Sequence, residues 1–378
     1  MLDRPNGGQR AVLVGLAIGP RRDHAALEEL AALATSAGAT IVGRVTGKRS
    51  APDPALYAGK GKVDEILEMR GQSGADLVIF DHALSGVQQR NLEQALECRV
   101  VDRTSLILDI FAQRARSAEG KLQVELAQLA HLSTRLVGGW THLERQKGGI
   151  GLRGPGETQL ETDRRLIGKR VKLLKERLKR VTVSRGVQSR NRKRSRVRTI
   201  ALVGYTNAGK STLFNRLTRE RVYAADQLFA TLDTTLRRVR LDSGASIVVS
   251  DTVGFIRELP HDLVAAFRAT LSEAAEADLM LHVIDASATD RDAQVEAVDA
   301  VVEEIGASEV PQLRVLNKCD LAGLPPGIER DGCGTIAAVR VSALTGDGIA
   351  DLRAALAERF GAAPVPATID LSSPALPG

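Results

Sequence analysis

Short apolar runs alternate with amphipathic helical patterns over the first third of the chain. Polar or turn residues bound the apolar runs, and the helical patterns repeat with a period of about 3.6 residues. The expected strands cover 11–18, 40–45, 77–80 and 100–101, and the expected helices cover 25–37, 63–69, 87–96 and 105–115. Strands that alternate with helices are typical of a parallel sheet. We therefore predict a small parallel α/β domain over residues 1–115.

A different hydrophobic period begins near residue 118. Leucines recur at heptad spacing through 118–137, and a second helical pattern with one apolar seam covers 157–183. The repeated positions are Leu122, Leu126, Leu129 and Leu136 in the first pattern and Leu160, Ile167, Val171, Leu174, Leu178 and Val181 in the second. Between them, residues 138–156 contain seven glycines and Pro155, which argues against regular structure. We predict an antiparallel helical hairpin, a short coiled coil, over residues 116–197, with the glycine-rich segment at its tip.

Strand and helix patterns alternate again from residue 198. Strands are expected at 199–203, 246–250, 279–285 and 313–317, and helices at 209–217, 263–276 and 292–305. This order predicts a doubly wound α/β domain over residues 198–361. Residues 362–378 lack periodicity, and we expect them to form a flexible tail.

Length and composition agree with this division. A chain of 378 residues is longer than one hydrophobic core usually supports. Its three cysteines form no CxxC pair, which argues against a disulfide framework and against a zinc site. No segment approaches the run of about 18 apolar residues that a spanning helix requires. We expect a cytoplasmic, monomeric protein that does not insert into a membrane.

The positive charge is concentrated in the middle of the chain. The formal net charge is +6, yet residues 145–198 hold 19 Lys and Arg against four carboxylates. That segment therefore carries +15, and the remainder carries −9. A basic block in an acidic protein is either a solvated helix face or a nucleic-acid contact, and the acidic surroundings favour nucleic acid.

Residues 204–211 match the phosphate-binding pattern GxxxxGK[ST] between an expected strand and an expected helix. The residues of this loop are Gly204, Tyr205, Thr206, Asn207, Ala208, Gly209, Lys210 and Ser211. Its glycines let backbone N–H groups and the helix N-terminus point at a β-phosphate. We expect Lys210 to bridge the β- and γ-phosphates and Ser211 to bind Mg²⁺.

Three later motifs, each at the end of an expected strand, indicate that the nucleotide bound here is a guanine nucleotide. They comprise Asp251, Thr252, Val253 and Gly254; Asn317, Lys318, Cys319 and Asp320; and Ser342, Ala343 and Leu344. The Asp251 carboxylate can hold Mg²⁺ through water, and the Gly254 amide can sense the γ-phosphate. The Asp320 carboxylate offers two acceptors to the paired N–H donors that guanine has and adenine lacks. We therefore predict GTP and GDP binding and GTP hydrolysis, with the third motif supporting the edge of the base.

The loop between the phosphate-binding loop and Asp251 supplies a further candidate for Mg²⁺. Its residues are Phe229, Ala230, Thr231, Leu232 and Asp233, which we include in the GTP site. We expect the Thr231 hydroxyl to complete the magnesium shell when GTP is bound. A purely structural threonine in a turn is the alternative, because Thr234 and Thr235 lie close by in the sequence.

The catalytic group is not identified by the sequence. Phe255 stands where many GTPases carry the glutamine that orients the attacking water, and phenylalanine has no hydrogen-bonding atom. We expect slow intrinsic hydrolysis, with Lys210 and Thr231 supporting the transition state. Asn207 is a candidate ligand for K⁺ beside the phosphates. A role for Asn207 in stabilising the loop alone is an equal alternative.

A long glycine-rich signature adds a family resemblance. Residues 148–165, Gly-Gly-Ile-Gly-Leu-Arg-Gly-Pro-Gly-Glu-Thr-Gln-Leu-Glu-Thr-Asp-Arg-Arg, are similar to the signature of the HflX family of ribosome-associated GTPases, which belong to the TRAFAC class of P-loop GTPases. Tyr-Ala-Gly-Lys-Gly-Lys at 57–62, Asp-Arg-Thr at 102–104 and the loop at 229–233 also resemble that family. The resemblance covers residues 10–361.

The resemblance implies a partner and an activity. Members of such a family are cytoplasmic GTPases that bind the large ribosomal subunit and its rRNA, split stalled or idle ribosomes, and insert the hairpin near the peptidyl-transferase centre. Ribosome-stimulated hydrolysis is the family expectation. The hairpin tip then offers Arg153, Gly154 and Gly156 as candidate ribosome contacts.

The chain departs from the family pattern at two points. Thr234 stands where many relatives have proline, a change that should alter the stiffness of the loop without changing the magnesium ligand. The chain also ends soon after the GTPase domain, so any contact made by a further C-terminal domain is in doubt. Two other functions stay open: a ribosome-assembly GTPase, and an RNA-remodelling binding module, for which we find no second phosphate loop.

Overall fold

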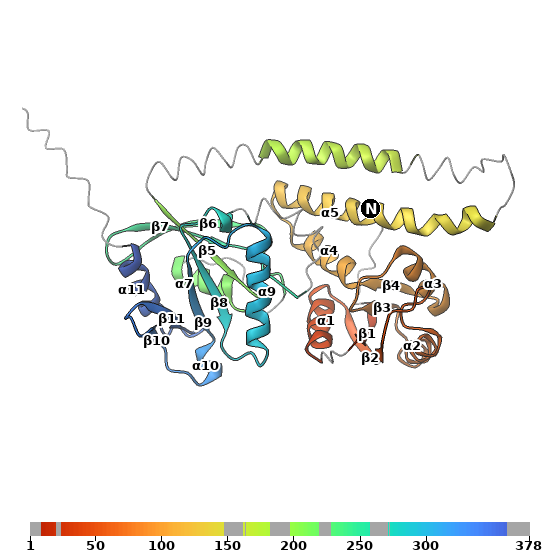
Figure 1. Ribbon diagram of the computed structural model, residues 1–378, viewed down its shortest axis with the longest axis horizontal. Helices are drawn as coiled ribbons and strands as arrows, with labels where there is room; N and C mark the ends of the chain where they lie inside the picture. Colours follow the sequence, from red (N-terminus) through yellow and green to blue (C-terminus); the bar gives the residue numbers. More distant parts are fainter. Residues whose placement is uncertain are drawn as a thin grey trace, which may run out of the picture.

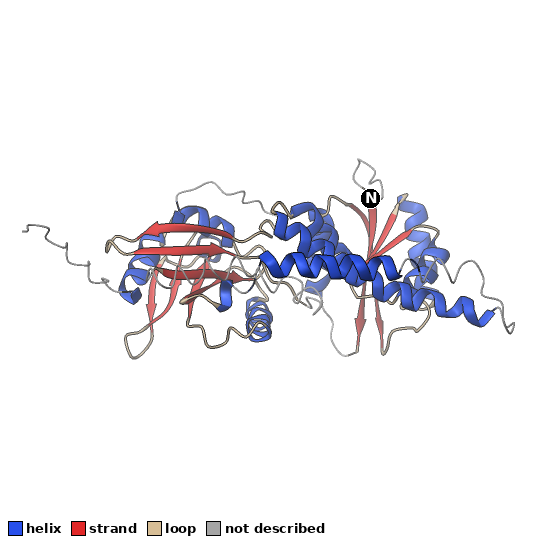
Figure 2. Cartoon of the chain, turned by 90° about the horizontal axis from the view of Figure 1, so that it is seen from above, coloured by secondary structure: helices blue, strands red, loops and turns tan. Residues whose placement is uncertain are grey.

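The structure is a computed structural model that confirms the predicted α/β fold class (Figure 1). It describes residues 9–19, 24–146, 162, 164–181, 197–218, 228–257, 271 and 273–360. Two sheets lie side by side, and a pair of long helices runs along one side of the N-terminal sheet (Figures 1 and 2). The predicted ribosome contacts Arg153, Gly154 and Gly156, and the predicted tail 362–378, lie outside the described residues.

The N-terminal sheet contains four parallel strands in the order β2-β1-β3-β4. The strands are β1 (Arg10–Ile18), β2 (Thr40–Arg49), β3 (Leu77–Phe80) and β4 (Arg99–Asp102), and the helices are α1 (His24–Ser36), α2 (Lys60–Ser73), α3 (Gly86–Leu96) and α4 (Arg103–Arg114). Side chains alternate along β1, so that Leu13 belongs to the core beneath α1 and α4, and Val12 to the core beneath α2 and α3. All four residues of β3 are buried, as expected for a parallel strand covered on both faces.

Helix α5 (Ala118–Gln146) and the helix at residues 164–181 run antiparallel beside one another (Figures 1 and 2). The Arg170 guanidinium lies 2.7 Å from the Glu125 carboxylate, and Leu174 is fully buried. One expectation was wrong: α5 does not stop before Gly138 but continues to Gln146. A glycine inside a helix costs only about 1 kcal/mol relative to alanine, so Gly138 and Gly139 weaken the helix without ending it.

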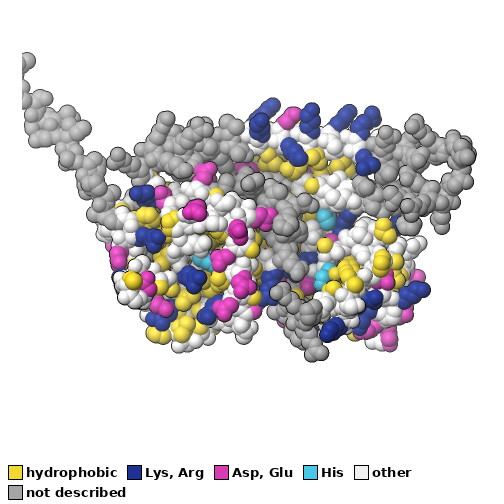
Figure 3. Space-filling model, viewed as in Figure 1, with side chains coloured by type: hydrophobic (Ala, Val, Ile, Leu, Met, Phe, Trp, Pro, Cys, Tyr) yellow, Lys and Arg dark blue, Asp and Glu magenta, His cyan; other side chains and the backbone are white. Residues whose placement is uncertain are grey.

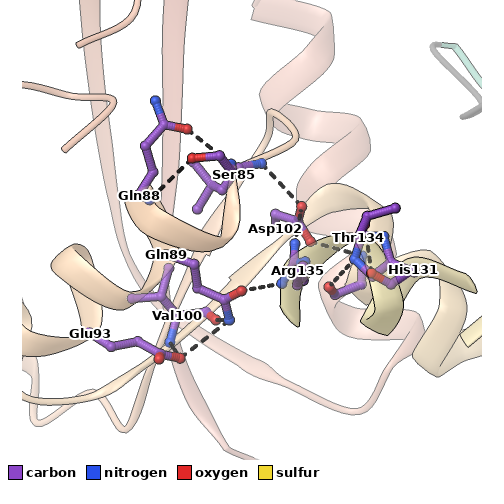
Figure 4. A network of polar contacts seen from close by, with 11 residues as sticks. Ser85, Gln88, Gln89, Glu93, Val100, Asp102, His131, Thr134 and Arg135 are labelled. Carbon is purple, nitrogen blue, oxygen red and sulfur yellow. Dashed lines mark hydrogen bonds and ion pairs between the residues drawn. The ribbon is translucent and has the colours of Figure 1, made fainter. Parts of the chain in front are cut away.

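Polar contacts fix α5 to the N-terminal sheet (Figure 4). The Arg135 guanidinium of α5 lies 2.6 Å from the Asp102 carboxylate, whose side chain has no exposed surface, and it also donates to Gln89. One turn earlier on α5, the His131 ring shares a hydrogen bond of 3.2 Å with the Ser105 hydroxyl. These bonds join the end of β4, α3, α4 and α5 into one unit.

The second sheet has seven strands in the order β10-β11-β9-β8-β5-β7-β6. The strands are β5 (Arg198–Gly204), β6 (Thr235–Arg240), β7 (Ser246–Asp251), β8 (Leu279–Asp285), β9 (Gln312–Asn317), β10 (Gly327–Arg330) and β11 (Ile336–Arg340), and the helices named around them are α7 (Lys210–Thr218), α9 (Arg291–Glu304), α10 (Cys319–Ala322) and α11 (Ile349–Phe360). The central strands are parallel, whereas β6 and β10 are antiparallel to their neighbours. Sequence patterns missed these two edge strands because they are short, largely polar and half-exposed.

The carboxyl ends of the parallel strands gather the predicted motifs at one edge of this sheet. The phosphate-binding loop follows β5, Asp251 ends β7, Asn317 ends β9 and Ser342 follows β11 closely. This edge is where ligands bind in doubly wound folds. Among the described residues, no helix combines the length and apolar character that crossing a bilayer would need.

Candidate functional site

The phosphate-binding loop turns sharply between β5 and α7. Asn207 and Gly209 have φ of 59° and 89°, and a Cβ on Gly209 would lie 2.2 Å from Nδ2 of Asn317. Glycine is therefore required where the loop approaches Asn317. The cavity beside the loop is lined by Thr206, Asn207, Gly209, Lys210, Ser211, Thr212, Phe229, Ala230, Thr231, Thr252 and Gly254. Sequence analysis missed Thr212, although it directly follows the motif.

Lys210 is buried at the floor of this cavity. Its Nζ donates to the carbonyl oxygens of Gly204 and Tyr205 at 3.0 and 2.7 Å. Burial lowers the pKa of Lys210 to about 8, against the opposing effect of the Asp251 carboxylate. A bound phosphate would place negative charge beside this buried ammonium group, so the site favours an anionic ligand.

Three side-chain oxygens converge next to Lys210 and form what we call the magnesium cluster: Ser211, Thr231 and Asp251. Oγ of Ser211 lies 2.7 Å from both Oγ1 of Thr231 and Oδ2 of Asp251, and Thr231 lies 2.9 Å from the same carboxylate oxygen. Burial raises the pKa of Asp251, and its Oδ1 is buried with no hydrogen-bond partner among the described residues. Hydroxyl and carboxylate oxygens suit Mg²⁺, so these residues fit the ion that a GTPase uses.

The geometry distinguishes between the nearby threonines. Thr231 points into the magnesium cluster, whereas the Thr234 hydroxyl is buried without a partner in the described part of the chain, and Thr235 begins β6. Thr231 is thus the threonine that can reach the ion. Its binding to Mg²⁺ stays a prediction.

The Asn317 amide joins the predicted guanine end of the site to the predicted phosphate end. Asn317 donates from Nδ2 to the Ala208 carbonyl at 2.8 Å and accepts at Oδ1 from the Ala343 N–H at 2.9 Å. Asp320 is exposed in the short helix α10, and Leu344 is 73% exposed. The predicted base-recognition groups therefore face solvent on a backbone that Asn317 holds in place.

The remaining residues of these motifs have structural contacts. Lys318 has φ of 61°, and its ammonium group lies 2.8 Å from the Asp285 carboxylate. Cys319 is buried, and its N–H donates to the Val341 carbonyl at 3.1 Å. The Ser342 hydroxyl accepts from the Thr345 N–H at 3.2 Å. These contacts fix the loops that present Asp320 and Leu344.

Sequence analysis missed a second connection across the site. Arg216 on α7 donates from Nε to the Ala343 carbonyl at 2.9 Å and from a terminal nitrogen to the Leu344 carbonyl. The helix that begins at the phosphate-binding loop thereby also holds the loop that we predict to support the base. The spacing of Arg216 from Lys210 fits no motif, so nothing in the sequence marks Arg216 as part of the site.

Phe255 is fully buried and lies in the same core as Phe229. Its backbone pairs with the phosphate-binding loop, accepting from the Thr206 N–H at 2.7 Å and donating to the Gly204 carbonyl at 3.1 Å. The side chain at this position therefore faces the core and not a water molecule in the cavity.

Four of the predicted nucleotide-site residues that do not line the cavity have side chains that lie in the core or contact the N-terminal part of the chain. Leu232 and Val253 belong to the core. The Tyr205 hydroxyl donates to Glu29 of α1 and accepts from the Arg257 N–H at 3.0 Å. The Asp233 carboxylate is bonded to the start of α5. Two of the four thus connect the GTPase domain to the N-terminal part of the chain.

A buried polar network forms much of that connection. The Arg103 guanidinium lies 2.7 Å from the Asp81 carboxylate and 3.0 Å from that of Glu29, and it donates to the Arg257 carbonyl at 3.2 Å. Burial raises the pKa of Glu29 and, with the Glu29 charge beside it, that of Tyr205. Sequence analysis recognised Asp-Arg-Thr at 102–104 only as a resemblance. The structure assigns Asp102 to holding α5 and Arg103 to the domain interface.

Comparisons with known proteins agree with this architecture. Family models match residues 24–112 as "GTP-binding GTPase N-terminal", 114–192 as "GTP-binding GTPase Middle Region" and 199–318 as "50S ribosome-binding GTPase". The chain is 57% identical to "GTPase HflX" of Escherichia coli (strain K12) over 361 residues, which cover 95% of this chain and 85% of that one. It is 50% identical to "GTPase HflX" of Caldanaerobacter subterraneus subsp. tengcongensis over 324 residues, 85% and 76% of the two chains.

A solved structure supports the fold. The crystal structure of the SsGBP and GDP complex superimposes with a TM-score of 0.51 at 25% identity, covering 93% of this chain and 98% of that one. That likeness spans the N-terminal sheet, the helical region and the GTPase domain together.

Proposed function

The chain belongs to the HflX family of GTPases, and from this premise we propose that it binds the large ribosomal subunit and separates stalled or idle ribosomes into subunits. As a member of this family it binds GTP and hydrolyses it to GDP and phosphate. The description matched by residues 199–318 names binding to the 50S ribosome, which supports the choice of partner. The cytoplasm is the compartment that this partner implies.

The observation that carries the proposal is the outer helix of the hairpin, residues 164–181. All nine of its Lys and Arg side chains are exposed, and Glu176 is the one carboxylate in that stretch. Figure 3 shows basic side chains along the outer edge of this helix. RNA phosphates attract such a row of cations, and release of their counterions supplies affinity. The helix therefore suits a surface of rRNA.

GTP supplies the switch in this proposal. Lys210 would hold the β- and γ-phosphates, and the magnesium cluster would hold the ion that neutralises their charge. The Gly254 N–H would report the γ-phosphate. Because Phe255 is buried, its side chain orients no water. We therefore propose slow hydrolysis by the free protein, acceleration on the ribosome, and release of the protein after hydrolysis.

Potassium is a proposed second cation. Asn207 is exposed, lines the phosphate cavity and has a φ of 59°. Its side-chain oxygen would bind K⁺ where other GTPases use an arginine. Hydrolysis rates in KCl should then exceed those in NaCl at equal ionic strength. Equal rates would leave Asn207 with a structural role alone.

Sedimentation of intact ribosomes tests the main proposal. Ribosomes are incubated with the protein and GTP, GDP or a non-hydrolysable GTP analogue and then separated on a gradient. We expect separated subunits, with the protein on the large one, in the presence of the analogue. An Asp320→Asn variant should lose this effect at low nucleotide concentration, because its amide donates a hydrogen where guanine also donates one. The proposal fails if the analogue causes neither separation nor co-migration.

A charge variant tests the surface. Replacement of Lys172, Lys175 and Lys179 by alanine should weaken binding to the large subunit and lower the slope of log affinity against log salt by about two to three. Nucleotide affinity should stay unchanged.

The matched control removes three exposed cations from the GTPase domain, namely Arg238, Arg240 and Arg291. If the two triple variants lose the same affinity, net charge and not this helix determines binding. Binding to immature particles without any effect on mature ribosomes would favour a ribosome-assembly function instead.

A further inference from the structure

The loop that carries Thr231 is bonded to the two residues that directly precede α5. Oδ2 of Asp233 accepts from the backbone N–H groups of Arg116 and Ser117, both at 2.8 Å. The Ser117 hydroxyl donates to Oδ1 of Asp233 and accepts from the Gly120 N–H at 2.8 Å. We call these four residues the clasp. A carboxylate from the GTPase domain thus accepts from the N–H groups just before the first residue of the hairpin helix, where the helix dipole also favours negative charge.

The fit between the two elements is close. A Cβ built on Gly120 would lie 2.1 Å from Oδ1 of Asp233, so any larger residue would push the carboxylate away. Glycine inside a helix is unfavourable by about 0.5–1 kcal/mol relative to alanine. The contact with Asp233 gives a physical reason for glycine at this position.

Other contacts hold the opposite end of the same loop, residues 228–233. The Leu228 N–H donates to the Ser36 hydroxyl of α1 at 3.0 Å. The Phe229 ring packs edge-to-face on Phe111 of α4, with ring centroids 4.7 Å apart. Thr231 lies between these anchors and the clasp. Both ends of the loop are therefore held by the N-terminal part of the chain, while Thr231 at its centre belongs to the magnesium cluster.

The N-terminal anchors belong to one unit. Arg135 fastens α5 to Asp102 (Figure 4), and His131 fastens it to Ser105. These contacts tie α5, which follows the clasp residues Arg116 and Ser117, to the N-terminal sheet and α4.

We propose that Asp233 is a positioning residue for the GTP-bound state: together with Ser117 and Gly120 it holds the loop so that Thr231 meets Mg²⁺. The N-terminal part of the chain then supplies part of the geometry that distinguishes GTP from GDP. A threonine in this loop contacts the ion only while the γ-phosphate is present. Loss of the clasp should therefore weaken GTP binding and leave GDP binding nearly unchanged. By linkage, GTP binding strengthens the clasp to the same extent.

The test measures equilibrium binding of GDP and of a non-hydrolysable GTP analogue to the ribosome-free full-length protein with Mg²⁺. The Asp233→Ala and Gly120→Ala variants perturb the clasp from opposite sides. We expect each to weaken analogue binding by about fivefold to tenfold, as for loss of a helix cap, with less than a twofold change for GDP. Asp233→Asn, which keeps an acceptor, should recover part of the loss. Lys121→Ala, an exposed residue on the same turn of α5, should change neither affinity.

A double-variant cycle and folding controls complete the test. The Ser117→Ala and Asp233→Ala effects on analogue binding should be less than additive, since both remove one contact. If Asp233→Ala does not fold, Gly120→Ala decides the question, because alanine favours the helix itself. Equal weakening of GDP and the analogue, or no change in either, overturns the proposal. Because ribosomes are absent, this outcome is independent of the test of ribosome splitting.

Discussion

Removal of Arg103 should reveal how strongly the two parts of the chain are joined. The Arg103 side chain is 6% exposed, and its partners Asp81 and Glu29 are 10% and 12% exposed. An Arg103→Ala variant removes a cation from beside two buried carboxylates and a hydrogen-bond donor from the Arg257 carbonyl. Breaking a buried ion pair by removing one partner typically costs about 3–5 kcal/mol. We expect a loss of that size at pH 8.

The pH dependence of this loss follows from Glu29. Burial raises the pKa of Glu29 above its ordinary value even with Arg103 present, so the folded protein favours the protonated carboxyl. For such a group the favourable contribution to folding is present at low pH and is lost as pH rises through the folded pKa. Without Arg103 that pKa rises further. The loss of unfolding free energy caused by Arg103→Ala should therefore shrink as pH falls from 8 toward 5.

The assay is urea unfolding of the full chain without nucleotide, at several pH values. Arg99→Ala is the matched control, because Arg99 lies near the same motif but forms an exposed ion pair. Its guanidinium lies 3.7 Å from the Asp109 carboxylate, and the Arg99 side chain is 57% exposed. Its loss should be below about 1 kcal/mol at every pH. The reasoning is refuted if the two variants lose equal stability, or if the deficit of Arg103→Ala grows at low pH.

Two further measurements address the nucleotide site. Burial lowers the pKa of Lys210 to about 8 in the free protein, and bound phosphates must raise this pKa. GDP binding should therefore take up a proton, and the affinity for GDP should weaken as pH rises through about 8. Calorimetry in buffers of different ionisation heat measures the proton uptake, and a pH-independent affinity would contradict the reasoning. Arg216→Ala should weaken GDP binding by roughly tenfold, because it releases the loop at Ala343. This corresponds to the loss of about 1.4 kcal/mol expected for hydrogen bonds from a charged donor, and Arg216→Lys should recover part of it. An unchanged affinity would show that Asn317 alone holds the loop.

Local sequence was sufficient to predict a nucleotide site. The phosphate-binding loop is a contiguous pattern whose glycines and lysine act through neighbouring backbone, so Lys210 and Ser211 could be found without tertiary information. The later motifs were recognisable because parallel strands bring their carboxyl ends to one edge of the sheet. Chain order therefore predicted that Asp251 and Asn317 would lie beside that loop, and they do.

Secondary structure was predicted well where the pattern is buried and less well elsewhere. Strand β3 was located to its end residues because all of its side chains are buried. The exposed edge strands β6 and β10 were missed, and the end of α5 was placed too early, because polar edges and isolated glycines give weak local signals.

Only the tertiary structure revealed the connections between the GTPase domain and the rest of the chain. Tyr205 meets Glu29 across 176 positions of sequence, and Asp233 meets Ser117 across 116. A tyrosine or aspartate in a motif looks the same in the sequence whether it faces a nucleotide or another domain. The choice depends on which distant backbone N–H groups and carboxylates folding places beside it, and no local period or spacing encodes that proximity.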